Sequence, residues 1–193
     1  MKDDIDIEIR PSDLVCHNVL AMAEVNSPLD LVKVVGSFKF SEYDETKFSC
    51  VRVRLSKFRC TVSIFSTGKL QVTGARNPED AHEALQFVAY RLKKKSENEI
   101  IFSNFKIENI LATFDIGSRM DLYGLSQEKE LTVTYMPSQF AAAVVREVST
   151  GVVVDVFSSG KMNIKGKVGI ETLCKGVNIL MPRISRYICE ELL

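Results

Sequence analysis

The sequence has no Trp, no long apolar run and no excess of charge of either sign. Lys and Arg number 25 and Asp and Glu also number 25 among 193 residues, so the formal net charge is zero. Without a run of about 18 apolar residues we expect no membrane-spanning helix. The first residues, MKDDIDIEIR, are too acidic and too polar for a signal peptide. Because 46% of the residues are hydrophobic, disorder is excluded as the dominant state.

Cysteine and catalytic motifs are also sparse. The 5 cysteines are odd in number and form no CxxC motif, so we expect neither a disulfide framework nor a zinc site, and a reducing compartment fits best. No Ser/His/Asp, paired-carboxylate or glycine-rich phosphate-loop pattern occurs. The sequence therefore predicts a protein that is not an enzyme, with no metal, no cofactor and no small-molecule substrate.

The chain repeats itself. IFSTGKLQVTG around Phe65 matches VFSSGKMNIKG around Phe157, 92 positions later. Further matches at nearly the same offset keep the same order: Asn18–Ala21 with Asn109–Ala112, Tyr43 with Tyr135, Phe48 with Phe140, and Arg54 with Arg146. We interpret the chain as two homologous repeats, 12–98 and 103–193, preceded by an acidic tail, 1–11.

Each repeat has the same predicted order of elements, namely a strand, a short helix, four antiparallel strands and a long helix. Residues 48–55, FSCVRVRL, alternate between apolar and basic residues as a half-buried strand does. Ala141, Ala143 and Val145 are expected to share one buried face in the second repeat. Glycine turns at 66–68 and 158–160 predict hairpins. This pattern predicts an α+β fold with antiparallel strands.

The long helices are expected to cover one face of these strands. The first begins after Asn77 and Pro78 and has an apolar stripe at Ala81, Ala84, Leu85, Val88, Ala89 and Leu92. The second has a matching stripe at Ile170, Leu173, Cys174, Val177, Leu180, Met181 and Ile184, and Pro182 is expected to kink it.

The opposite strand face combines aromatic, amide and basic residues, which fits neither a core nor an ordinary solvated surface. Strand parity assigns to this face Asn18, Leu20, Phe48, Arg52, Arg54, Phe65 and Thr73, and in the second repeat Asn109, Leu111, Phe140, Arg146, Asp155 and Phe157. Residues 46–78 hold seven Lys or Arg and no acidic residue. This local charge, hidden by the neutral total, indicates a nucleic-acid-binding surface.

The repeats resemble the TATA-box-binding protein family across about 180 residues. The resemblance rests on the Asn-Val/Ile-Leu-Ala strand of each repeat, the Phe-x5-Arg strand, the hairpin with Phe-Ser-Ser/Thr-Gly-Lys, and the TGAR sequence that leads into the first long helix. Pro182 stands where the family also has a proline in its last helix.

This resemblance implies a curved, pseudo-symmetric ten-stranded antiparallel saddle with helices on its convex face. It implies that the chain binds A·T-rich double-stranded DNA from the minor groove and bends it. It also implies that the chain nucleates transcription initiation with general transcription factors and RNA polymerase. Insertion of apolar side chains between base steps of the minor groove is well known for this family. Three roles follow for the open face. Phe48, Phe65, Phe140 and Phe157 would wedge between base steps. Asn18, Leu20, Thr73, Asn109 and Leu111 would meet base edges. Arg52, Arg54, Lys69, Arg146 and Lys161 would bind phosphates.

The sequence also departs from the family pattern. Ser63, Gln71, Asp155, Asn163 and Lys165 replace the usual apolar or β-branched residues around the hairpins, and the loop before Phe140 has no acidic residue. A second hypothesis is therefore a divergent paralogue that serves mainly as a protein-interaction or inhibitory module, with weak or non-TATA DNA binding. A third, an enzyme that reuses the saddle as some DNA glycosylases do, is disfavoured because no second catalytic domain is present. A homodimer through the concave face and a nuclear location, or a cytoplasmic one in an archaeal source, complete the expectations.

Overall fold

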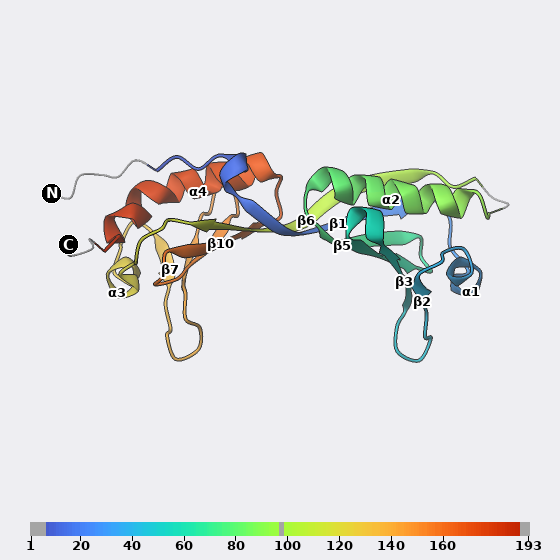
Figure 1. Ribbon diagram of the computed structural model, residues 1–193, viewed down its shortest axis with the longest axis horizontal. Coiled ribbons are helices and arrows are strands. Elements are labelled where there is room, and N and C mark those ends of the chain that lie inside the picture. Colours follow the sequence, from blue (N-terminus) through green and yellow to red (C-terminus); the bar gives the residue numbers. More distant parts are fainter. Residues whose placement is uncertain (1–6, 97–98, 190–193) are drawn as a thin grey trace. The chain divides into compact units, whose positions relative to one another are not determined.

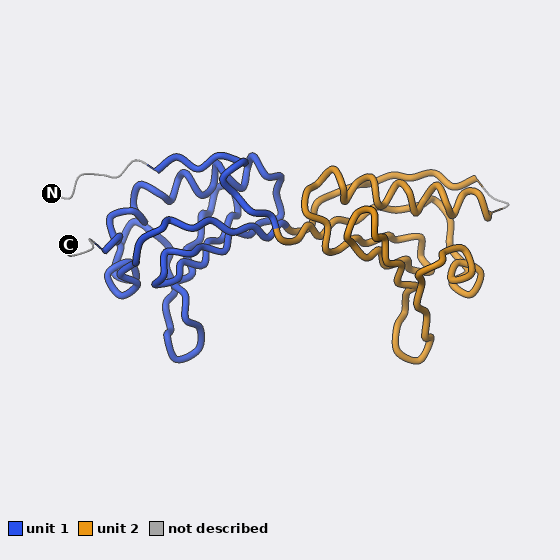
Figure 2. The backbone as a smooth tube through the Cα atoms, in the orientation of Figure 1, with its two compact units in different colours: residues 1–16, 110–193 blue, residues 17–109 orange. Residues whose placement is uncertain are grey.

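The computed structural model of the chain describes residues 7–96 and 99–189. The backbone divides into two compact units, which Figure 2 shows in different colours. Unit 2 comprises residues 17–109, and unit 1 comprises residues 1–16 and 110–193. Each unit holds most of one sequence repeat, so the internal duplication is visible in the backbone as well.

The elements follow the predicted order in both repeats (Figure 1). The first repeat contains β1 (Val15–Val25), α1 (Leu31–Val35), β2 (Ser41–Glu42), β3 (Cys50–Leu55), η2 (Ser56–Phe58), β4 (Cys60–Phe65), β5 (Lys69–Ala75) and α2 (Pro78–Lys93). The second contains β6 (Phe102–Asp115), α3 (Leu122–Ser126), β7 (Thr132–Thr134), β8 (Ala143–Arg146), β9 (Val153–Val156), β10 (Lys161–Gly166), α4 (Ile170–Ile184) and η3 (Ser185–Tyr187). A short helix, η1 (Pro11–Asp13), precedes β1.

The strands of each repeat pair in an antiparallel manner. Their order is β2-β3-β4-β5-β1 in the first repeat and β6-β10-β9-β8-β7 in the second. The registers agree between the repeats: Ser63 lies opposite Gln71, and 92 positions later Asp155 lies opposite Asn163. The predicted α+β class with ten antiparallel strands is therefore confirmed.

One face of each set of strands is covered by the long helix of its repeat. In Figure 1, α2 lies across unit 2 and α4 across unit 1, while the β2–β3 and β7–β8 loops extend to the opposite side. Every predicted stripe residue of α2 is buried. In α4 the stripe is buried except for the half-buried Ile170, and the helix continues through Pro182 to Ile184. No described helix is long and apolar enough to cross a membrane.

The two predicted glycine hairpins are confirmed, and their geometry explains the glycines. Gly68 has a φ of +91° and Gly160 a φ of +90°, a region that residues with a Cβ atom rarely adopt. A Cβ atom on Gly68 would lie 2.6 Å from the carbonyl oxygen of Val25. The Gly68 N–H donates to Phe65 at 3.0 Å and the Gly160 N–H to Phe157 at 2.9 Å. Each turn therefore fixes the position of the Phe at its start, Phe65 at the end of β4 and Phe157 directly after β9.

The expected face of Ala141 is wrong. Ala141 is exposed, whereas Ala142 and Ala143 are both buried. The cause is local, because residues 141–142 form a bend and β8 begins only at Ala143. Alternation between the two faces of a strand applies only where the backbone is extended.

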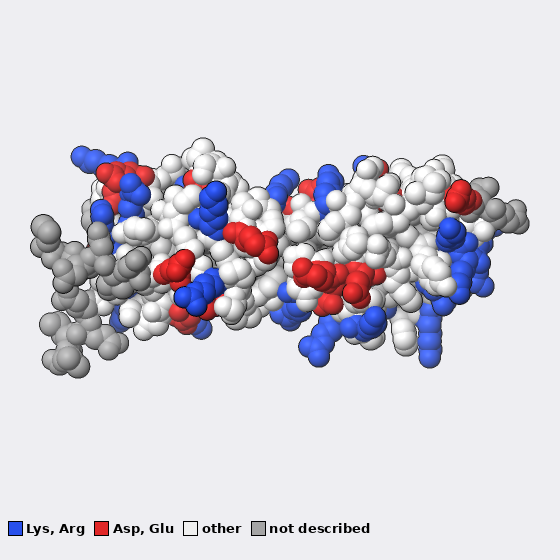
Figure 3. Space-filling view, turned by 90° about the horizontal axis from the view of Figure 1, so that it is seen from above, with Lys and Arg blue, Asp and Glu red and all other residues white. Residues whose placement is uncertain are grey.

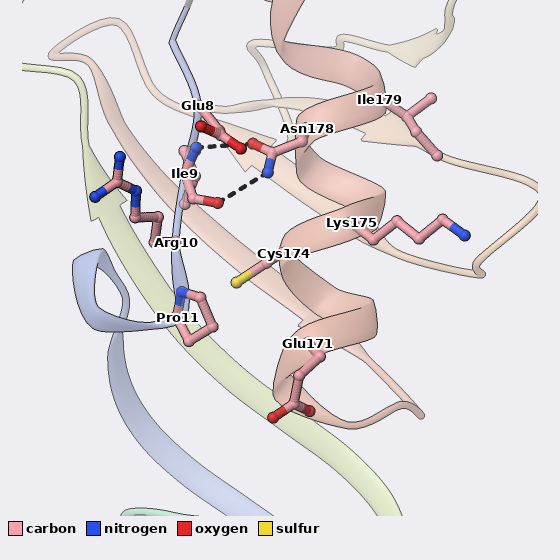
Figure 4. A pocket seen from close by; sticks show the side chains of 9 residues that line it. All are labelled: Glu8, Ile9, Arg10, Pro11, Glu171, Cys174, Lys175, Asn178 and Ile179. Atoms are coloured by element: carbon pink, nitrogen blue, oxygen red, sulfur yellow. Dashed lines mark hydrogen bonds between the residues drawn. The ribbon is translucent and has the colours of Figure 1, made fainter.

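The described part of the N-terminal segment packs on α4 within unit 1 (Figure 4). Ile9 is 2% exposed. The Ile9 N–H donates to Asn178 Oδ1 at 2.8 Å, and Asn178 Nδ2 donates to the Ile9 carbonyl oxygen at 2.8 Å. One asparagine thus satisfies both backbone groups of a single residue, as a neighbouring strand would.

Candidate nucleic-acid interface

The strand faces turned away from α2 and α4 present matched rows of side chains. Pairing of the strands defines the row in unit 2 as Arg52, Ser63, Gln71 and Met22. The row at the same positions in unit 1 consists of Val144, Asp155, Asn163 and Thr113. The predicted wedge residues Phe65 and Phe157 each follow a row residue by two positions, and the predicted base-contacting residues lie on β1, β5 and β6.

In unit 1 the two predicted wedge residues contact each other. Phe140 lies at the end of the β7–β8 loop and Phe157 directly follows β9. Their ring centroids are 6.0 Å apart with an interplanar angle of 73°, a favourable edge-to-face arrangement. Phe140 is 44% exposed. Two aromatic rings are thus held together on the uncovered side of this unit.

In unit 2 the equivalent rings are held differently. The Arg52 guanidinium lies 5.4 Å from the centroid of the Phe48 ring, a cation–π contact, and Phe48 is 38% exposed. Phe65, at the end of β4, lies opposite Cys50. Phe65 and Phe157 are half-buried.

Asn18 on β1 uses its amide oxygen within the protein. Asn18 Oδ1 accepts from the Gly74 N–H at 2.7 Å and from the Thr73 hydroxyl at 3.3 Å. Gly74 has a φ of +95°, and the pairing of β1 with β5 is irregular at this point. This bond fixes the amide so that the two Nδ2 hydrogens remain as donors. Donors are what the minor-groove acceptors, N3 of adenine and O2 of thymine, require.

The remaining predicted base contacts lie at matching places in the two repeats. Asn109 and Leu111 on β6 and Leu20 on β1 are half-buried, so each offers part of its side chain to solvent. Leu111 lies opposite Lys165, at the position where the first repeat has Thr73. Where the first repeat has the Thr73 hydroxyl bonded to Asn18, the second repeat therefore has the ammonium group of Lys165, which lies opposite β6.

The acidic residue on this face is neutralised by a neighbour. Lys165 Nζ donates to both carboxylate oxygens of Asp155, at 2.7 and 3.0 Å. The Asp155 side chain is 5% exposed and that of Lys165 is 40% exposed. Since a buried carboxylate is costly without a partner, the ion pair explains how Asp155 is accommodated on a strand face.

The predicted phosphate ligands are accessible but unequal in their surroundings. Lys69, Lys161 and Arg146 are exposed. Arg54 is also exposed, with its guanidinium 3.2 Å from Glu42 on β2. Glu42 lies outside the acid-free window 46–78, so counting along the sequence missed this partner. Pairing of adjacent strands brings it there, with Glu42 opposite Arg52.

The turn after Arg146 contains a second carboxylate that sequence reasoning missed. Glu147 is 9% exposed and accepts hydrogen bonds from the N–H and hydroxyl groups of Ser149 and Thr150. These bonds, chiefly that of the Thr150 hydroxyl, lower the pKa of Glu147 to about 2. The signal was present in the sequence as Glu followed by Ser and Thr in a turn. The carboxylate fixes the β8–β9 turn.

The described residues offer little for other chemistry. Among residues 7–96 and 99–189, no three His, Cys, Asp or Glu side chains cluster as metal ligands would. The surface that remains combines exposed or half-buried aromatic rings, the oriented Asn18 amide and accessible cations on uncovered strands. Such a surface suits a polyanion with flat, stacked groups.

Comparison with known proteins identifies the family that the two repeats match. Residues 13–95 and 104–187 each match the family described as transcription factor TFIID, or TATA-binding protein. A TATA-box-binding protein of Archaeoglobus fulgidus is 31% identical over 162 residues, covering 83% of this chain and 88% of that protein. One of Tetrahymena thermophila is 31% identical over 150 residues.

The chain spans less than two thirds of some of the relatives that it matches. The matched region spans 61% of the Tetrahymena protein and 63% of the Emericella nidulans protein. A solved structure of Methanococcus jannaschii TBP matches 90% of this chain and 99% of its own, with a TM-score of 0.77 and 28% identity. Both repeats are matched in sequence and the fold is matched in structure, so the chain belongs to the TATA-binding protein family.

Proposed function

We propose that this chain binds A·T-rich, TATA-like double-stranded DNA in the minor groove and bends it. In this role it is a transcription initiation factor that nucleates assembly of general transcription factors and RNA polymerase. The observation that carries the proposal is the aromatic pair of each repeat, Phe48 with Phe65 and Phe140 with Phe157, on strand faces that no helix covers. Aromatic rings that stay exposed or half-buried at matched positions of two repeats are unfavourable in water and would be useful as wedges.

The polar residues support the same reading. Asn18 and Asn109 would donate to minor-groove acceptors, with Thr73 beside the first, while Leu20 and Leu111 would exclude the amino group of guanine. Arg52, Arg54, Lys69, Arg146 and Lys161 would bind phosphates and make affinity depend on salt. The proposal includes no catalytic step and no cofactor. It includes a nuclear location, or a cytoplasmic one in an archaeal cell, and self-association through the DNA-binding face when DNA is absent.

A second candidate function rests on Asp155. A carboxylate on this face opposes the negative potential of a narrow minor groove. This favours a paralogue that acts mainly through proteins and binds TATA-like DNA weakly. The two candidates differ in one measurable quantity, the bend that the chain produces in A·T-rich DNA.

The test is a fluorescence-transfer assay of DNA bending on a panel of A·T-rich duplexes. The proposal predicts bending by the wild-type chain and a loss of bending in Phe48→Ala and Phe140→Ala. The matched control is Phe87→Ala on α2, because Phe87 is 41% exposed, close to the 44% of Phe140, but lies on the helix side. Binding without a bend would favour the second candidate, and equal loss in all three variants would refute the wedge.

A further inference from the structure

Three polar residues that depart from the family pattern lie together on the uncovered strand face of unit 1. Asp155 on β9 lies opposite Asn163 on β10, and Lys165 stands two positions further along β10, on the same face. Lys165 Nζ donates to both carboxylate oxygens of Asp155. All three residues belong to one unit, so the cluster is complete within it.

A carboxylate is unusual on this face. Figure 3 looks onto the side of each unit that α2 and α4 cover, and it shows Asp and Glu there among Lys and Arg. Among the residues of the two paired rows on the opposite side, Asp155 is the only acidic one. The first repeat has Ser63 at the equivalent position and forms the same strands. The fold therefore does not require a carboxylate here, and its purpose is to be sought in what this face binds.

The hydrogen-bonding groups of the cluster match one kind of base pair. An A·T pair presents only acceptors in the minor groove, whereas a G·C pair adds a donor, the N2 amino group of guanine. A carboxylate only accepts and has about four lone-pair sites, so its bonds from Lys165 do not exhaust it. Asp155 and Lys165 together present an acceptor beside a donor, which is the complement of the guanine amino group and the acceptor next to it.

Lys165 controls access to the carboxylate. The Asp155 side chain is 5% exposed, whereas that of Lys165 is 40% exposed. Because lysine has a flexible four-carbon stem, its ammonium group can turn toward a groove acceptor when DNA binds. A guanine amino group would then replace one of the hydrogen bonds that Lys165 donates. An A·T pair offers no such donor and would leave the carboxylate facing acceptors.

The place of the cluster on the strands limits which base pair it can contact. Asp155 precedes the predicted wedge residue Phe157 by two positions, or about 6.6 Å of extended backbone. Base pairs are about 3.4 Å apart, so the contact would lie within about two base pairs of this wedge. Leu111, which would exclude a guanine amino group, lies opposite Lys165, whereas Asp155 lies opposite Asn163. The two side chains would therefore meet different base pairs.

We propose that Asp155 accepts a hydrogen bond from the N2 amino group of a guanine, so that unit 1 favours a G·C pair at one step near its wedge. Lys165 donates to an acceptor of the same base pair, and without DNA it neutralises the buried carboxylate. At the equivalent step of unit 2, Ser63 offers no charged acceptor. This inference rests on the proposed function, because it requires that the strand faces meet the minor groove. It adds that an otherwise A·T-rich site contains a G·C pair at one end.

Base analogues that change only the minor-groove amino group test this proposal. Diaminopurine·T adds that amino group to an A·T pair, and inosine·C lacks the amino group of a G·C pair. Each is placed in turn at every position of one A·T-rich duplex, and affinity is measured by fluorescence anisotropy. For the wild type we expect about tenfold tighter binding when diaminopurine·T or G·C lies near an end of the bound site. Inosine·C at that position should give no gain.

A second amino group at the opposite end of the same site tests the difference between the units. The chain can bind in either direction along such a duplex, but only unit 1 carries the carboxylate. The second substitution should therefore add no further affinity. An equal further gain would mean that both units read the amino group, and it would overturn the assignment to Asp155.

Variants assign the preference to the carboxylate. Asp155→Leu should reverse it, and Asp155→Asn, which keeps the shape of the side chain, should reduce it. The matched control is Glu147→Gln, because Glu147 is a largely buried carboxylate of the same unit that lies in the β8–β9 turn. This control should leave the ratio of the two affinities unchanged. Circular dichroism of each variant separates a lost preference from lost folding.

The possible failures are distinct. Binding that ignores the amino group, or that it weakens at every position, would overturn this inference and leave the proposed function intact. A preference that persists in Asp155→Leu, or that disappears equally in Glu147→Gln, would do the same. Absence of binding to every duplex, including the one with only A·T pairs, would overturn the proposed function and this inference with it.

Discussion

The two repeats share a backbone but differ on the face that carries their function. At one pair of positions unit 2 has Ser63 and Thr73, whereas unit 1 has Asp155 and Lys165 joined by an ion pair. On the covered face the same strands have equivalent buried residues, Ile64 and Val72 in one repeat and Val156 and Ile164 in the other. Packing against the helices constrains the covered face, whereas the side chains of the other face differ between the repeats. Under the proposed function, the two halves of the DNA interface would therefore not read DNA in the same way.

The wedges illustrate the same asymmetry. Unit 1 supports Phe140 with Phe157, ring against ring, while unit 2 supports Phe48 with the cation of Arg52. At the position equivalent to Arg52, unit 1 has Val144. If Phe48 acts as a wedge and Arg52 binds phosphate, as proposed, unit 2 would place these two roles side by side, whereas unit 1 would not.

The largest expected effect is on the ion pair of unit 1. Lys165→Ala leaves the buried Asp155 carboxylate unpaired, and we expect a loss of about 2–3 kcal/mol in the free energy of unfolding, reduced from the value for a fully buried pair because Lys165 is partly exposed. Urea unfolding followed by circular dichroism measures it. The matched control is Thr73→Ala in unit 2, expected to cost about 0.5–1 kcal/mol. Equal losses at the two positions would mean that the ion pair does not stabilise unit 1.

The Asp155–Lys165 pair also allows the two repeats to be compared by their effect on DNA affinity. Asp155→Leu removes an acceptor that faces groove acceptors, so we expect about tenfold tighter binding to an A·T-rich duplex, or about 1.4 kcal/mol. Lys165→Thr alone should weaken binding, and the double variant should bind more tightly than the two single effects predict. A double-mutant cycle on DNA affinity measures this coupling. Unchanged or weaker binding by Asp155→Leu would argue that unit 1 does not contact DNA as unit 2 does.

Sequence alone predicted the order of elements and the α2 stripe, because strand and helix periodicities are local properties of the chain. The Asp155–Lys165 ion pair is consistent with strand parity, since both positions share a face of the adjacent strands β9 and β10. Sequence reasoning missed Glu42 beside Arg54 because that contact depends on which strand pairs with β3. The roles of the wedge residues on DNA remain predictions.

A smaller effect is expected at the turns that follow β3 and β8. Arg59 has a φ of 50°, in the left-handed region, and its counterpart Gly151 has a φ of 72°. Arg59→Gly should therefore raise the free energy of unfolding by about 0.5 kcal/mol, and Gly151→Arg should lower it by about 1 kcal/mol. Thermal unfolding of both variants measures these changes in the free energy of unfolding. A gain from Gly151→Arg would show that the two turns do not share a backbone conformation.

The smallest expected effect concerns pH and the β8–β9 turn, which in unit 1 is fixed by a carboxylate. The pKa of Glu147 is lowered from 4.5 to about 2 by hydrogen bonds to its ionised form, first that of the Thr150 hydroxyl. Its stabilising contribution is therefore complete above about pH 4.5 and is lost as the pH falls toward 2. Glu147→Gln should unfold more readily than the wild type at neutral pH, and the difference should shrink through this window. Glu45→Gln, an exposed change in unit 2, serves as the control. A difference that persists unchanged down to pH 2 would mean that packing, and not the ionised carboxylate, stabilises the β8–β9 turn. An ionised carboxylate would then not distinguish this turn from the β3–β4 turn of unit 2.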